Sequence, residues 1–143
     1  MEWFVWAVLA AFFAGLTAIL AKAGVAGVDS NLATAIRTAV VMVLSWGIVL
    51  CTVPLRQVTE LNRRTWMFLA LSGIATGLSW LCYFRALQLG EVSRVAPIDK
   101  LGVVFAVIFA ALFLRERLNG LQVAGVTFIV IGAIALSWNG GGK

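Results

Sequence analysis

Residues 94–114 read RVAPIDKLGVVFAVIFAALFL, and after the first turns this stretch is apolar to its end. A helix of about 20 largely apolar residues crosses the hydrocarbon core of a bilayer, which is roughly 30 Å thick. Pro97, Asp99 and Lys100 nevertheless lie near the start of the stretch. Charged side chains are costly inside a membrane and usually face the interior of a helix bundle. The stretch therefore predicts a transmembrane helix that carries polar residues for a reason.

The composition of the whole chain supports a membrane setting. Its 143 residues are 62% hydrophobic and 12% charged, whereas about a quarter of the residues of a soluble domain are charged. The net charge of +5 comes from basic residues scattered in ones and twos, so no nucleic-acid surface is expected. With no histidine, and with Cys51 and Cys82 both in apolar runs, we expect no metal site, no cofactor, no disulfide framework and no enzymatic constellation.

Five segments are long and apolar enough to span the membrane. The expected spans are residues 3–21, 32–53, 66–84, 94–114 and 121–138, which makes the chain (1–143) a single all-α domain, a bundle of five transmembrane helices. The sequence 21–23 resembles a signal-peptidase site, but the start lacks a basic region and the apolar run is too long, so the first segment is expected to be a span. Ser93 and Asn119 are expected to cap the fourth and fifth helices.

The basic residues divide almost evenly between the two membrane faces. The face of the N-terminus, face A, holds Arg56, Arg63, Arg64, Arg115 and Arg117, and the opposite face B holds Lys22, Arg37, Arg85, Arg94, Lys100 and Lys143. An excess of Lys and Arg orients a membrane protein with that side in the cytoplasm. The near balance is either noise in this rule or a sign that the chain inserts in both orientations. Without Arg37, Arg85 and Lys100, counted as membrane-embedded, five basic residues on face A stand against three on face B, a weak lean toward face A in the cytoplasm. With insertion in both orientations, an antiparallel homodimer would reproduce the inverted repeats of many transporters.

Two charged residues lie at equal depth in parallel spans. Arg37 comes six residues after Asn31, and Asp99 comes six residues after Ser93, so each lies about 9 Å along its helix from face B. The equal depth predicts an ion pair between Arg37 and Asp99, with Arg85 as a competing partner for Asp99. The group is either a structural cluster that fixes helix register or a site for substrate or a coupling ion, and intramembrane charge favours the site. Pro97 is expected either to kink the helix or, slightly preferred, to be tolerated in its first turns.

Polar and small side chains line the faces of the same helices. Ser72, Thr76, Ser79 and Tyr83 share one face of the third span, and Thr34 and Thr38 share a face of the second beside Arg37. For Trp80, a role in helix packing is preferred to a role as an aromatic surface on which a ligand stacks. The candidate substrate-binding or coupling-ion residues are Arg37, Thr38, Thr76, Ser79, Trp80, Tyr83, Arg85 and Asp99.

An ordered set of residues runs through the last three spans, in residues 78–136: Tyr83, Ala86-Leu87, Gly90, Ser93, Val95 and Pro97-Ile98, then Glu116, Gln122, Gly125 and Gly132. In these features residues 78–136 resemble the EamA-type repeat of the drug/metabolite transporter superfamily. The resemblance implies a transporter of small organic solutes. Most family members hold two inverted five-helix repeats, whereas one repeat is present here, which fits a homodimer. In two respects the chain departs from the pattern: Arg115 replaces a small residue before Glu116, and the first span has no central carboxylate, so proton-for-cation exchange is not carried over.

The sequence thus predicts a multi-pass protein of a prokaryotic inner membrane. It would move a small metabolite or drug-like solute by alternating access, as an antiparallel homodimer in the lipid bilayer. Two alternatives stay open: a non-transporting assembly or lipid-binding protein, and one half of an obligate heterodimeric transporter.

Overall fold

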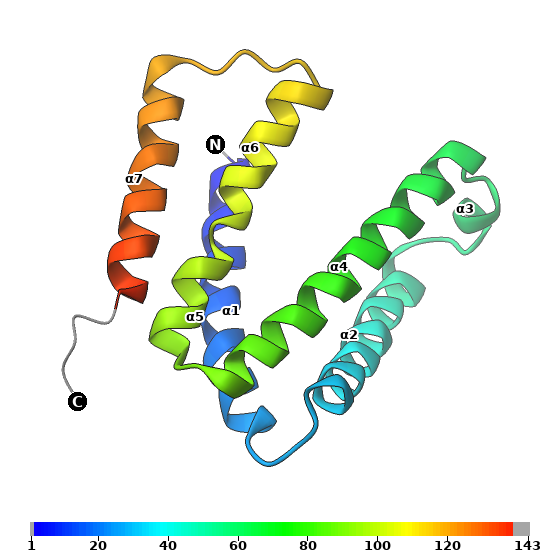
Figure 1. Ribbon diagram of the computed structural model, residues 1–143. Helices are drawn as coiled ribbons and strands as arrows, with labels where there is room; N and C mark the ends of the chain where they lie inside the picture. The colour runs from blue at the N-terminus through cyan, green and yellow to red at the C-terminus, as the bar shows by residue number, and fades with distance from the viewer. Residues whose placement is uncertain (1, 139–143) are drawn as a thin grey trace. The chain divides into compact units, whose positions relative to one another are not determined.

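The structure, a computed structural model, describes residues 2–138, and these form helices without any strand. The helices are α1 (Glu2–Val25), α2 (Ser30–Thr52), α3 (Arg56–Thr59), α4 (Arg63–Leu89), α5 (Val92–Asp99), α6 (Gly102–Phe113) and α7 (Gly120–Ser137) (Figure 1). Five stretches are long and apolar enough to cross a membrane: α1, α2, α4, α7 and residues 92–113, which contain α5 and α6. The prediction of an all-α protein with five spans is confirmed.

Side-chain caps fix where several helices begin. Asp29 Oδ1 accepts hydrogen bonds from the backbone N–H groups of Asn31 and Leu32, which starts α2. Asn119 and Gln122 form the complete capping box of α7, as the sequence predicts, with bonds of 2.8 and 2.9 Å. These bonds satisfy N–H groups that have no partner within the first turn of a helix.

The expected cap of the fourth span is wrong. Glu91, not Ser93, is the N-cap of α5, and its side chain makes no capping bond. Glu91 has an extended backbone (φ −77°, ψ 144°), and helical geometry begins at Val92. Ser93 therefore already lies inside the first turn of α5.

The fourth span is interrupted at Lys100 and Leu101. The N–H of Leu101 bonds to Ile98 O, and the N–H of Val104 bonds to Leu101 O, so the ladder tightens from i→i−4 to i→i−3 bonds at the junction. Pro97 lies in α5, and its missing N–H removes the helical partner of the Ser93 carbonyl. Pro97 thus stands inside the helix, and the interruption follows it by one turn.

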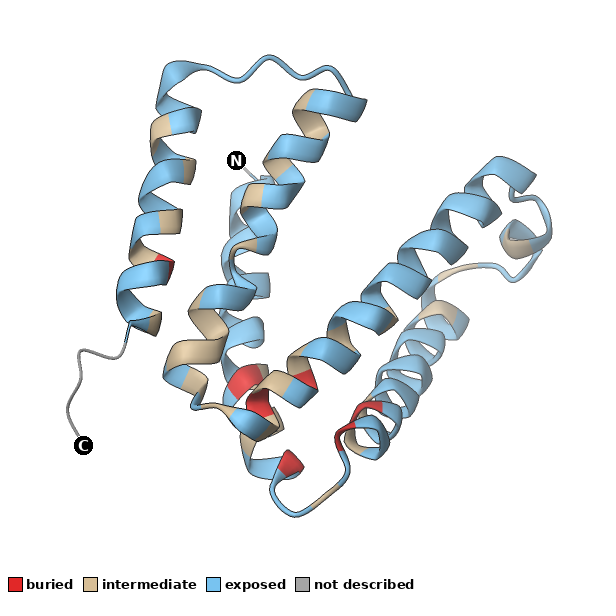
Figure 2. Ribbon diagram, viewed as in Figure 1, coloured by how far each residue is buried: buried red, intermediate tan, exposed pale blue. Residues whose placement is uncertain are grey.

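Two compact units make up the chain. One contains residues 2–19 and 89–138, and the other contains residues 20–88. In the first unit, α7 packs against both α5 and α6. In the second, buried residues gather near the loop between α1 and α2, where Figure 2 shows red segments on three helices. They are Val25, Ser30, Thr34, Phe84 and Leu87.

Most other side chains of the spans are exposed, including large apolar ones such as Phe12, Val43 and Phe128. Helices that are apolar on all sides are typical of membrane spans, because lipid covers the surface that water would otherwise contact. The protein is therefore a multi-pass integral membrane protein.

Candidate functional site

Arg37 lies against aromatic rings of α4. Its guanidinium carbon is 4.1 Å from the centroid of the Trp80 ring and 5.5 Å from that of Phe84. Both distances are within the roughly 6 Å at which a cation is attracted to the electron-rich face of an aromatic ring. Phe84 is almost fully buried, and Trp80 is partly buried. The two rings therefore hold an intramembrane cation in a fixed place on α2.

Tyr83 belongs to the same group, because it interacts electrostatically with Arg37. It is the only tyrosine of the chain, and it neighbours Phe84, with ring centroids 6.4 Å apart. We call Arg37, Trp80, Tyr83 and Phe84 the arginine–aromatic cluster. All four residues lie in the unit of residues 20–88.

The predicted hydroxyl groups are engaged with their own helices. Thr38 Oγ1 donates to Thr34 O, and Thr76 Oγ1 donates to Ser72 O. Such i→i−4 bonds satisfy a hydroxyl without a neighbouring helix. Thr38, Thr76 and Ser79 are exposed, whereas Thr34 is buried and Tyr83 is half-buried, so the two polar lines face outward only in part.

Arg85 does not join this cluster. It lies within α4, and not at the end of a span as the sequence suggests, because α4 continues to Leu89. Its Nη1 donates to Gln88 Oε1 at 2.6 Å, and Gln88 Nε2 donates to Val28 O at 2.7 Å. Lys22 Nζ donates to Leu87 O at 2.6 Å. The bond from Lys22 satisfies a carbonyl at the C-terminal end of α4, where cations are favourable. The bond from Gln88 connects the same end of α4 to the segment between α1 and α2.

Asp99 and Lys100 form an ion pair at the interruption of the fourth span. Lys100 Nζ lies 3.3 Å from Asp99 Oδ2. Adjacent residues of a regular helix point about 100° apart. Here α5 ends at Asp99 and Lys100 is its C-cap, and the long side chain of Lys100 reaches back to Asp99. The predicted Arg37–Asp99 pair joins the two units and stays a prediction. Each of its residues comes seven positions after the first residue of its helix.

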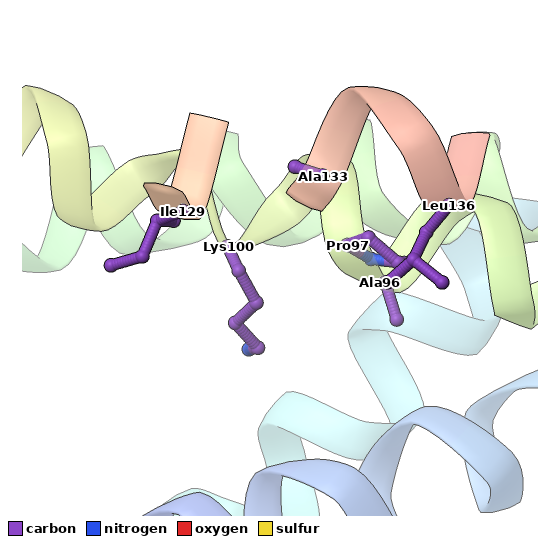
Figure 3. Close-up of a pocket in the computed structure, with 6 residues that line it drawn as sticks. All are labelled: Ala96, Pro97, Lys100, Ile129, Ala133 and Leu136. Atoms are coloured by element: carbon purple, nitrogen blue, oxygen red, sulfur yellow. The ribbon is translucent and has the colours of Figure 1, made fainter. Parts of the chain in front are cut away.

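An open groove of about 360 Å³ runs between α5 and α7. It is lined by Ala96, Pro97, Lys100, Ile129, Ala133 and Leu136 (Figure 3). In Figure 3 the side chain of Lys100 extends away from α7. Beside the groove, Arg94 Nε and Nη2 donate to Ser137 O at 3.4 and 3.5 Å. The single proton of Ser137 Oγ is shared between Ala133 O of its own helix at 2.7 Å and Arg94 O at 3.2 Å. The bonds between Arg94 and Ser137 tie the start of α5 to the end of α7.

The structure thus brings together three of the predicted residues, Arg37, Trp80 and Tyr83, and leaves Arg85, Thr38, Thr76 and Ser79 outside the cluster. Sequence reasoning missed Phe84. The available signal was its position four residues after Trp80, which places both rings on one helix face. Phenylalanine in an apolar span is otherwise indistinguishable from a lipid-facing residue.

Comparison with known proteins identifies a family and two relatives of this chain. The profile of the EamA-like transporter family matches residues 1–138. The chain belongs to that family. A protein of Sinorhizobium sp. named "uncharacterized transporter in cobO 3'region" is 53% identical over 136 residues, which cover 95% of this chain and 96% of that relative. An uncharacterized protein of Methanocaldococcus jannaschii is 30% identical over 94 residues, 64% of this chain and 69% of the relative. No solved structure matches the chain.

The EamA-like assignment confirms the resemblance seen in residues 78–136 and extends it to the first two spans. The protein is accordingly a membrane transporter by family. Its arginine–aromatic cluster and the interrupted fourth span are the two features that place polar groups within that EamA-like fold.

Proposed function

We propose that the protein is one subunit of an antiparallel homodimer that moves a small organic solute across a prokaryotic inner membrane by alternating access. The observation that carries this proposal is the interrupted fourth span, where Pro97 precedes the charged pair Asp99–Lys100. Transporters place their substrate and ion sites at discontinuous helices near the middle of the membrane. An EamA-like chain with such a helix fits this pattern.

Two features support the homodimer, the distribution of basic residues between the membrane faces and a pair of glycines on α4. The basic residues are nearly balanced between faces A and B, which gives neither orientation a clear advantage. Gly73 and Gly77 of α4 meet no atom of residues 20–88 within 4 Å of an added Cβ. Such small-residue surfaces let helices of another subunit approach closely. A five-span subunit needs a second copy to form the interface between inverted repeats.

The orientation of the chain tests the dimer. A single cysteine is added after Lys143, outside the described residues, in a chain without Cys51 and Cys82, and is labelled in intact cells with a membrane-impermeant maleimide. Labelling of about half of the molecules, rising to all after permeabilisation, is expected of equal insertion in both orientations. Labelling that is complete or absent before permeabilisation contradicts the homodimer and directs the search to an oppositely oriented partner chain.

Asp99 tests transport. The purified protein is reconstituted into liposomes, and uptake of radiolabelled amino acids, sugars and carboxylates is compared with uptake by empty liposomes. Asp99→Asn is expected to abolish flux while the dimer survives size-exclusion chromatography. Glu60→Gln is the matched control, because Glu60 pairs only with Arg56 on the short helix α3. Loss of stability without a specific loss of flux assigns Asp99 a structural role and favours a non-transporting protein.

A further inference from the structure

The charge of Arg37 is not balanced within its own unit. The carboxylates among residues 20–88 are Asp29 and Glu60. Asp29 caps α2 through Oδ1, and Glu60 Oε1 lies 2.9 Å from Arg56 Nε. Neither contacts Arg37: its guanidinium lies over the rings of Trp80 and Phe84, and Tyr83 interacts with it electrostatically. An intramembrane cation without a carboxylate partner is costly, and this cost marks functional positions.

Aromatic contact leaves the donors of the guanidinium available. The Trp80 ring lies 4.1 Å from the guanidinium carbon, and the face of an aromatic ring offers no oxygen acceptor to the guanidinium. The five N–H donors lie in the plane of the guanidinium, around its edge. The two carboxylates of residues 20–88 are engaged elsewhere, Asp29 with the backbone of α2 and Glu60 with Arg56. The edge of Arg37 is thus equipped to meet an acceptor that the unit itself does not supply.

The carboxylate that the sequence pairs with Arg37 already has a partner. Asp99 Oδ2 lies 3.3 Å from Lys100 Nζ within its own unit. An Asp99–Lys100 pair is neutral overall, whereas Arg37 retains its positive charge. Taken one unit at a time, the charges therefore favour an anion from outside the chain as the acceptor for Arg37.

We infer that Arg37 is the recognition residue for a small organic anion, and that the substrate class of this transporter is the carboxylates. Two oxygens of a carboxylate match the parallel N–H groups of a guanidinium, which makes a bidentate contact with charge on both sides. Trp80 and Phe84 hold the guanidinium in place, so little conformational freedom is lost when the anion binds. The inference rests on the proposed function in calling the anion a substrate.

Binding is measured on the full chain in detergent, by thermal unfolding followed through tryptophan fluorescence. Benzoate, benzamide and benzylammonium serve as probes, because they share one ring and differ in charge. Benzoate is expected to raise the unfolding midpoint in a saturable way, and the other two are not. Arg37→Gln is expected to weaken the apparent affinity for benzoate by about tenfold or more, since a charge-assisted hydrogen bond is lost.

Two further variants sharpen this result. Arg64→Gln is the matched control, because Arg64 also lies over a ring, that of Phe68 at 5.7 Å, but at the start of α4. It is expected to leave the affinity unchanged. Arg37→Lys retains the charge without the planar pair of donors, so an intermediate affinity is expected. It also replaces Arg37→Gln as the decisive variant if the glutamine chain does not unfold cooperatively.

The inference is overturned if benzoate protects both Arg37 variants as well as the parent chain. It is also overturned if neither benzoate, acetate nor glutarate protects the parent chain at any concentration up to the solubility of each salt. Failure of the proposed homodimer is a separate outcome, because binding in detergent does not depend on orientation in the cell. One-sided labelling after Lys143 together with Arg37-dependent benzoate binding would remove the antiparallel dimer and leave the anion site.

Discussion

The guanidinium of Arg37 on α2 lies over the indole of Trp80 on α4, 4.1 Å from its centroid, and Phe84 approaches from the next turn of the same helix. Forty-three positions separate Arg37 from Trp80 in the sequence. The contact connects two spans through an electrostatic attraction that persists where water is scarce. The guanidinium N–H donors of Arg37 are thus positioned by aromatic rings and not by a carboxylate.

Trp80→Ala is expected to lower the free energy of unfolding in detergent by about 1–2 kcal/mol, because the cation–π contact is lost. Trp80→Phe retains an aromatic face and should lose less. The measurement is a double-mutant cycle with Arg37→Gln, in which a coupling energy of about 0.5–2 kcal/mol is expected. Additive effects of the two substitutions would show that the contact does not contribute to stability.

Ser137→Ala is expected to lower the free energy of unfolding by about 0.5–1 kcal/mol, because the hydroxyl proton that Ser137 shares between Ala133 O of its own helix and Arg94 O of α5 is lost. Thr127→Ala is the matched control on α7, since Thr127 Oγ1 bonds only to Val123 O of its own helix. Chemical unfolding of both variants in mixed micelles checks the difference. Equal effects would mean that the bond between α5 and α7 adds nothing.

Arg115→Gly is expected to stabilise the connection between α6 and α7. Arg115 has φ of 56°, a left-handed conformation that costs a residue with a side chain roughly 1 kcal/mol more than glycine. A rise in the thermal midpoint checks the prediction, and Arg117→Gly, two residues on without a positive φ, should produce no rise.

Pro97→Ala is expected to stabilise the fourth span by up to about 3 kcal/mol, because alanine restores an N–H donor toward the Ser93 carbonyl. If the interrupted span moves during transport, the same variant should slow uptake into liposomes although the protein is more stable. Pro54→Ala is the control, since Pro54 lies between α2 and α3. Unchanged uptake by Pro97→Ala would separate the interruption from the transport cycle.

Most of the fold could be predicted from local sequence patterns. Span number follows from apolar length, because each membrane helix satisfies its own backbone hydrogen bonds and needs no distant partner. The capping box of Asn119 and Gln122 is likewise contained within four residues. The predicted end of the third span is wrong, and residues far apart in the sequence meet there. The helix α4 continues to Leu89, and Lys22 Nζ donates a hydrogen bond to Leu87 O.

The candidate site divides in the same way. Apolar length and helical rise are enough to predict that Arg37 lies inside a span, at a depth matched by Asp99 in its own span. Tertiary contacts were needed to find that Arg37 lies over Trp80 and Phe84, that Lys100 pairs with Asp99, and that Arg94 bonds to Ser137. Each of these contacts depends on where a helix ends or on which faces meet. In a membrane those faces are not distinguished by hydrophobicity, because lipid is as apolar as the helices themselves.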